Sequence, residues 1–291
     1  MAALYSLKRM IIMKSIWLRF PGGKRKALTL SYDDGVEQDI RLLELMAQHG
    51  VKGTFNINSG GYAAEGTVYP HGQISRRMSK SQCTQIYNSP FAEVAVHALT
   101  HAFLNSITPA MVMKEIIQDR ENLENQFGKI IRGMAYPYGT YNDMVVQVLD
   151  QAGIAYARTV HSHLSFDMPS DWLRMGATCH HKNPQLMQLA EKFLNETPER
   201  DPYLFYLWGH SFEFDKDNNW NVIEEFLKTA GGRDDIWYAT NIEIYDYNKA
   251  FENLQYSVDG RFIHNPSAIS VWVQIDKDTI EIPAGQNVKL K

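Results

Sequence analysis

Two adjacent carboxylates stand directly after a short apolar run of this 291-residue sequence. Asp33 and Asp34 follow residues Ala27–Ser31, and a carboxylate buried at that position would need a positively charged partner. A divalent cation supplies that partner if one aspartate binds it while the other stays free to act as a base. Taken alone, Asp-Asp-Gly is also typical of an ordinary turn at the end of a strand.

Two histidines four residues apart offer metal ligands of a second kind. His97 ends the run Glu93–His97, whose alternating valines predict a strand, and His101 follows it. If the segment turns as a helix, both imidazoles share one face and reach one metal ion, although such pairs are more often structural. Two histidines and one aspartate would leave a coordination position open, as in catalytic rather than structural zinc sites.

Two further segments come after predicted strands. Pro137-Tyr138-Gly139 predicts a turn that presents an aromatic ring and a free backbone N–H. His210 lies just beyond the apolar run Tyr203–Trp208. Opposite a carboxylate base, a histidine there would act as a general acid, because its pKa lies near the working pH.

Composition excludes several classes of protein. The chain is 44% hydrophobic and 21% charged with a net charge of −4, which excludes disordered, collagen-like and rod-like proteins and disfavours nucleic-acid binding. No apolar run reaches the roughly 18 residues of a membrane span, and two cysteines form no disulfide framework. Lys8, Arg9 and Lys14 interrupt the first residues, so we expect no secretory signal and a cytoplasmic location.

Strand-like and helix-like stretches alternate between residue 27 and about residue 247. The predicted strands are 27–31, 53–57, 93–97, 133–137, 154–160, 203–208 and 236–240, and the predicted helices are 39–49, 108–128, 142–153, 183–194 and 222–227. This alternation indicates an α/β protein with parallel strands, and about seven units favour a closed or nearly closed barrel. No glycine-rich nucleotide-binding motif follows any of the strands.

The pattern changes after about residue 250. Val271, Val273 and Ile275 alternate with Trp272 and Gln274, a turn follows at 276–278, and Ile280 and Ile282 alternate beyond it. The sequence therefore predicts a barrel over residues 1–250 and a short β-hairpin extension over residues 251–291 that packs on the barrel.

In this order, the four segments resemble the motifs of the polysaccharide deacetylase family (carbohydrate esterase family 4) over about residues 27–240. Members of that family are metal-dependent N- or O-deacetylases on a distorted (β/α)₇ barrel, so the resemblance implies that fold here. Ser31–Gly35 corresponds to the family's T-F-D-D-G motif, which implies that Asp33 is the base and Asp34 a metal ligand. His97 and His101 correspond to its H-[ST]-x-x-H motif and would be the other two ligands.

The same resemblance implies roles for two later residues. At a third position the sequence departs from the family's pattern. His210 matches the acid of the family's L-x-H motif, and the backbone N–H of Tyr138 would bind the oxyanion. The usual R-P-P-Y-G motif has lost its arginine, whose place Ala135 takes. We therefore expect Arg158 or Arg174 to orient the base in its stead.

The high aromatic content, 12% of residues, fits either side chains that pack the core of the barrel or a site that stacks on a sugar ring. We expect Tyr136, Trp172 and Trp208 to contact substrate, with Trp172 matching the family's D-x-x-D-W motif only loosely. The expected cofactor is Zn²⁺ from the ligand types, while Co²⁺, Ni²⁺ or Mn²⁺ could occupy the same site.

The sequence thus predicts a metal-dependent hydrolase that removes acetyl groups from a carbohydrate. One alternative is a hydrolase of a small non-sugar amide or imide on the same barrel. A second is a catalytically silent carbohydrate-binding member, against which the retained acid and base argue. No G-x-S-x-G motif supports a serine hydrolase, and Cys179-His180-His181 is interpreted as structural.

Overall fold

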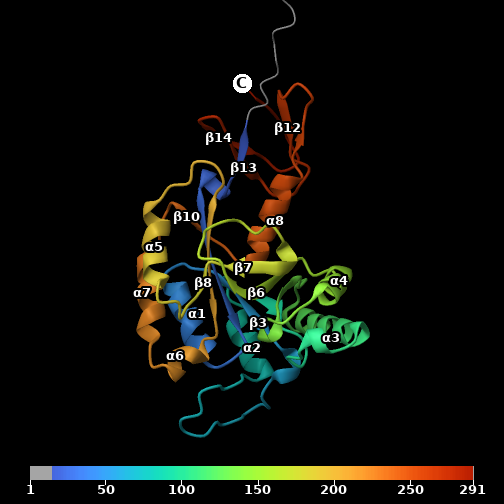
Figure 1. Ribbon diagram of the computed structural model, residues 1–291, viewed down its shortest axis with the longest axis vertical. Helices are drawn as coiled ribbons and strands as arrows, with labels where there is room; N and C mark the ends of the chain where they lie inside the picture. The colour runs from blue at the N-terminus through green and yellow to red at the C-terminus, as the bar shows by residue number, and fades with distance from the viewer. Residues whose placement is uncertain (1–14, 291) are drawn as a thin grey trace, which may run out of the picture. The chain divides into compact units, whose positions relative to one another are not determined.

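Parallel strands form the centre of the larger of two compact units in the computed structural model, which describes residues 15–290 (Figure 1). This unit contains residues 26–197 and 203–245. Its strands are β2 (Lys26–Asp33), β3 (Gly53–Ile57), β4 (Ala92–Val96), β5 (Gly133–Ala135), β6 (Tyr156–Ser162), β7 (Met175–Ala177), β8 (Cys179–His180), β9 (Tyr203–Gly209) and β10 (Ile236–Tyr238). Hydrogen-bonded neighbours follow the order β7-β6-β5-β4-β3-β2-β9-β8, and β10 pairs with the start of β2.

The two ends of this sheet belong to one extended segment. β7 pairs with β6, β8 pairs with β9, and only Thr178 separates β7 from β8. The N–H of Leu164 donates to the Thr178 carbonyl, and the N–H of Tyr206 donates to its hydroxyl, each at 3.0 Å. Residues 175–180 therefore occupy the seventh strand position between β6 and β9, although no continuous ladder joins β7 to β8. This is the predicted distorted (β/α)₇ barrel.

One predicted strand has a different place. The sequence pattern assigns residues 236–240 to the barrel, whereas β10 contains three residues that pair only with Lys26–Leu28 of β2. The segment 175–180 takes the barrel position instead. Its two short strands carry too few alternating apolar residues to be recognised from the sequence.

Helices cover the outside of the strands. They are α1 (Gln38–Gln48), α2 (Lys80–Tyr87), α3 (Pro109–Phe127), α4 (Asp143–Gln151), α5 (Leu186–Asn195), α6 (Phe212–Lys216), α7 (Trp220–Ala230) and α8 (Asn241–Glu252), the last of which continues beyond the larger unit. Figure 1 shows α1, α5 and α7 on one side of the strands and α3 and α4 on the other. All eight residues of β2 are buried, as expected for a parallel strand covered on both faces.

Local signals fix the predicted helix α3. The Thr108 side chain accepts a hydrogen bond from the N–H of Met111, Pro109 stands at the first turn, and Gly128 ends the helix at φ +63°. Val112, Ile116 and Leu123 form its buried face. The long helix thus places β4 and β5, the strands before and after it, side by side in the barrel.

The smaller unit contains the described residues among 1–25, together with 198–202 and 246–290. β13 (Val271–Ile275) and β14 (Asp278–Ile282) form the predicted hairpin, and β1 (Ile16–Arg19) pairs antiparallel with β13. β11 (Gln255–Tyr256), β12 (Phe262–His264) and β15 (Asn287–Lys289) form a second small sheet. The packing of residues 251–291 on the barrel stays a prediction.

Within residues 15–290, no helix is long and apolar enough to cross a bilayer.

Candidate active site

The carboxyl ends of the barrel strands bring the predicted chemical groups together. Asp33 is the last residue of β2, Asp34 follows it, His97 follows β4, and His210 follows β9. Because parallel strands end at the same rim of a barrel, these side chains meet there. Asp34 has a φ of +86°, and its N–H donates to the Asn56 carbonyl at 3.0 Å, so the chain turns sharply between the two aspartates.

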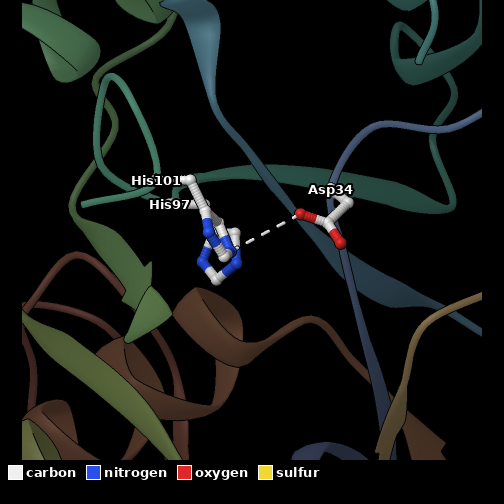
Figure 2. A group of neighbouring side chains, drawn as sticks. All are labelled: Asp34, His97 and His101. Carbon is white, nitrogen blue, oxygen red and sulfur yellow. Dashed lines mark ion pairs between the residues drawn. The ribbon is translucent and has the colours of Figure 1, made fainter. Parts of the chain in front are cut away.

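Three side chains could hold a metal ion. One ligand atom each of Asp34, His97 and His101 lies within 4.8 Å of the others, and Figure 2 shows both imidazoles facing the carboxylate. Asp34 Oδ1 is 3.7 Å from His101 Nε2. His97 Nδ1 donates to the Ala135 carbonyl at 2.8 Å, which leaves the Nε2 lone pair of the neutral ring free for a metal.

The histidine pair converges through an irregular turn rather than the helical turn considered from the sequence. Ala98 and His101 both have positive φ angles, +59° and +58°. Asn58 holds this turn, because its side-chain amide donates to the carbonyls of His97 and Ala98. The two imidazole rings lie edge to face, with centroids 4.8 Å apart.

Electrostatics favour the neutral, metal-binding form of both rings. Burial lowers the pKa of His97, although Asp33 and Asp34 oppose the effect. Burial and the neighbouring His97 lower the pKa of His101. Two neutral imidazole nitrogens and one carboxylate oxygen are a donor set that fits Zn²⁺ and leaves a position open.

Asp33 lies beside this group in a buried ion pair. Arg158 Nη2 is 2.5 Å from both carboxylate oxygens, and the Asn56 amide donates to Oδ1 at 2.9 Å. Burial alone would raise the pKa of Asp33, but Arg158, His97 and His210 outweigh it and lower the pKa to about 2. Asp33 is therefore ionised at neutral pH.

His210 stands between two carboxylates. Its Nε2 is 3.7 Å from Asp33 Oδ2, and its Nδ1 is 3.5 Å from Glu213 Oε2. Burial opposes protonation of the ring, but the contacts with Glu213 and Asp33 prevail and raise the pKa of His210. The geometry thus suits a histidine that holds a proton near neutral pH and can give it away.

A second group of possible ligands, His180, His210 and Glu213, also gathers within 4.8 Å. The backbone N–H of Lys182 donates to His180 Nδ1 at 3.1 Å, so a neutral His180 carries its proton on Nε2. That nitrogen is 3.1 Å from Glu213 Oε2. We interpret this group as imidazoles gathered around a shared carboxylate rather than as a metal site. Glu213 was not singled out in the sequence, although it stands three residues after His210.

The two arginines considered for orienting the base lie in different surroundings. Arg158 contacts Asp33, whereas Arg174 pairs with Asp143 at 2.8 Å and with Asp171 at 2.7 Å. Arg158 projects from β6, whose third residue pairs with Ala135 of β5. The neighbouring strand therefore supplies the guanidinium that Ala135 cannot.

The aromatic residues expected to contact substrate are mostly buried. Tyr136 donates its hydroxyl to the Leu173 carbonyl at 2.7 Å, and Trp172 and Trp208 are 8% and 7% exposed. Their contact with substrate stays a prediction. Tyr138, at a φ of +56°, is 55% exposed and stacks on Phe103 with centroids 3.8 Å apart. No motif in the sequence marks Phe103.

Sequence comparison relates the first half of the chain to a known family. Residues 20–157 match the family model described as polysaccharide deacetylase. A chitin deacetylase from Pestalotiopsis sp. is 23% identical over 150 residues, which cover 51% of this chain and 46% of that protein. The chain therefore spans about half the length of this curated relative.

Structural comparison shows the fold over most of the chain. A candidate polysaccharide deacetylase from Mycobacterium smegmatis superposes with a TM-score of 0.55 at 16% identity, covering 82% of this chain and 95% of that one. A family 4 carbohydrate esterase from Streptomyces lividans in complex with acetate reaches a TM-score of 0.47 at 16% identity, covering 71% of this chain and 88% of that one. The first of these similarities supports the barrel described above.

Proposed function

We propose that the protein is a metal-dependent hydrolase that removes acetyl groups from a carbohydrate, because residues 20–157 match the polysaccharide deacetylase family model. One observation carries the proposal. A buried aspartate with an arginine partner, a histidine 3.7 Å from it, and a two-histidine, one-aspartate group all meet at the carboxyl rim of one barrel. A binding protein needs neither the base nor the acid.

The proposed roles follow from charge and position. Asp33 is ionised and takes a proton from the attacking water, while Arg158 holds its carboxylate in place. His210 protonates the amine or alcohol that leaves, a step that an amine requires more strongly. The Tyr138 N–H would donate to the acetyl oxygen as negative charge develops on it.

Asp34, His97 and His101 are the residues proposed to hold the divalent ion, with zinc favoured by the two imidazole ligands. When bound, the ion supplies Lewis-acid polarisation of the acetyl carbonyl and lowers the pKa of water. The acetylated carbohydrate is proposed as substrate because the family model and the chitin deacetylase relative both point to that class.

The decisive experiment is a substrate panel on zinc-loaded protein. It contains N-acetylated chitooligosaccharides, O-acetylated oligosaccharides and small amides and imides, and it scores acetate and ammonia separately. We expect acetate from a glycan, released about 10²-fold or more slowly by the Asp33→Asn variant. Ammonia from an amide alone would instead identify a carbon–nitrogen hydrolase, and binding of glycans without turnover would identify a silent member.

A further inference from the structure

A positively charged side chain contacts the carboxylate that is proposed to bind the metal. Arg77 Nη2 is 2.8 Å from Asp34 Oδ1, and Nη1 donates both to the Asp34 carbonyl and, at 2.9 Å, to Asn58 Oδ1. Asn58 in turn donates to the carbonyls of His97 and Ala98. One guanidinium is thus connected to the segments that carry all three proposed ligands.

The guanidinium and the histidines face the same carboxylate oxygen. Oδ1 of Asp34 is the atom 3.7 Å from His101 Nε2, as the dashed line in Figure 2 marks, and it is also the atom that Arg77 contacts. A cation shared by Asp34 and the two imidazoles binds the oxygen on the imidazole side. Arg77 therefore places a unit positive charge on the oxygen that such a cation would use.

We propose that Arg77 competes with the divalent cation for Asp34 and so holds down the metal affinity of this site. This inference rests on the metal site of the proposed function. Two effects of Arg77 oppose each other, since a hydrogen-bonded carboxylate is also better oriented for a metal. We expect the repulsion between the guanidinium and the cation to outweigh the better orientation of the carboxylate. The Asp34 and Arg77 side chains are only 14% and 29% exposed, so water screens their charges less than it does at the open surface.

The position of Arg77 is fixed by the chain around it. The N–H of Met78 donates to the Gly35 carbonyl at 2.9 Å, which ties the segment carrying Arg77 to the turn after Asp34. The Tyr69 hydroxyl donates to the Arg77 carbonyl at 2.6 Å. A bound cation must therefore tolerate or displace a guanidinium that the backbone keeps beside it.

The neighbouring residue supplies a matched control. Arg76 belongs to the same segment and is 27% exposed, close to the exposure of Arg77, but it pairs with Glu37 at 2.6 Å and with Asp215 at 3.3 Å. Arg76→Gln removes the same charge from the same segment without touching Asp34. It separates a local effect on the ligand from a general change in net charge.

The test measures Zn²⁺ affinity by calorimetric titration against a competing chelator at fixed pH and salt. We expect Arg77→Gln to raise the affinity at least about tenfold, because a charge in contact with the ligand oxygen is removed. Arg76→Gln should stay within about twofold of the parent, since its charge lies farther from the ligands. Arg77→Met serves as a second uncharged variant if Arg77→Gln fails to fold, which thermal unfolding of metal-free protein reveals.

The outcomes separate this inference from the proposed function. Equal affinity in Arg77→Gln and parent, with binding lost in Asp34→Ala, overturns the competition and leaves the metal site standing. Weaker binding in Arg77→Gln also overturns it and identifies Arg77 as an orienting support. Absence of Zn²⁺ binding in both proteins overturns the inference and the proposed metal site together, whereas binding in Arg77→Gln alone supports both.

Discussion

Arg158 Nη2 lies 2.5 Å from both carboxylate oxygens of Asp33, and both side chains are buried. Arg158→Met would leave an uncompensated charge in the barrel. We expect the free energy of unfolding to fall by about 3–5 kcal/mol, the usual loss when one partner of a buried pair is removed. Turnover should fall as well, because the Asp33 carboxylate loses the side chain that holds it in place. Urea unfolding and kcat measure the two effects.

Arg174 provides the control for this prediction. Its partners Asp143 and Asp171 are exposed, so Arg174→Met should cost at most about 1 kcal/mol and leave kcat unchanged. An equal loss of activity in both variants would contradict a specific role of Arg158 in orienting the base.

Asp33 and Asp34 are adjacent, yet their substitution should have different consequences. Asp34→Ala removes one of three proposed ligands and should abolish zinc binding. Asp33→Asn keeps the ligands and the hydrogen-bonding shape, so zinc should remain while kcat falls by about 10²-fold or more. Elemental analysis of dialysed protein, together with acetate release, checks both. Undiminished turnover in Asp33→Asn would remove Asp33 from the role of base.

Much of this site could be predicted because its residues follow strands with clear apolar patterns. Asp33, His97 and His210 each come just after such a run, and the rule that parallel strands end at one rim brings them together. The alternation of strands and helices likewise predicts the barrel. Each of these patterns is local, because it involves residues that lie close together in the sequence.

The supporting residues depend on contacts between distant parts of the chain, which no local pattern encodes. Arg77 meets Asp34 across 43 positions, and Arg158 meets Asp33 across 125. The sequence favours Arg158 over Arg174 as partner of the base without deciding between them, and the ion pairs in the structure distinguish them. The pairing of β1 with β13 is invisible for the same reason, since the two strands lie at opposite ends of the sequence.

The carboxylate of Glu213 should set the alkaline limit of activity. The Glu213 contact raises the pKa of His210, which keeps the proposed acid protonated. Glu213→Gln removes that charge, so His210 loses its proton at lower pH and the alkaline limb of kcat/KM should move to lower pH. Asp217→Asn is the control, because Asp217 pairs with Lys182 at 2.8 Å. An alkaline limb that stays in place in Glu213→Gln would contradict the role of His210 as acid.

The exposed ring of Tyr138 should affect binding more than chemistry. Tyr138→Ala removes the ring that stacks on Phe103 but keeps the backbone N–H proposed to contact the oxyanion. We expect the exposed ring to stack on the sugar of the substrate, so loss of that contact, worth about 0.5–1.5 kcal/mol, should raise KM by about 2- to 12-fold with little change in kcat. Phe103→Ala should act in the same direction. A collapse of kcat at unchanged KM in Tyr138→Ala would instead indicate that the turn itself had moved.

Asp39 should make stability depend on pH. It is buried at the start of α1 and accepts hydrogen bonds from the hydroxyls of Ser211, at 2.5 Å, and Tyr87, at 2.6 Å. Burial raises its pKa to about 7, although these hydrogen bonds oppose the shift. A raised pKa means that the folded chain binds the proton more tightly, so the stabilisation is complete below the unfolded pKa of about 4 and is lost as pH rises through about 7.

Asp39→Asn stays neutral throughout this range and should remove that part of the pH dependence. The free energy of unfolding of the parent should decline between pH 4.5 and 7 more steeply than that of the variant, by at most about 1.4 kcal/mol per pH unit. Urea unfolding of chelator-treated protein at several pH values measures the difference. Asp143→Asn, at a side chain 90% exposed, should retain the parent slope. Identical slopes for Asp39→Asn and parent would contradict a raised pKa of Asp39 in the folded chain.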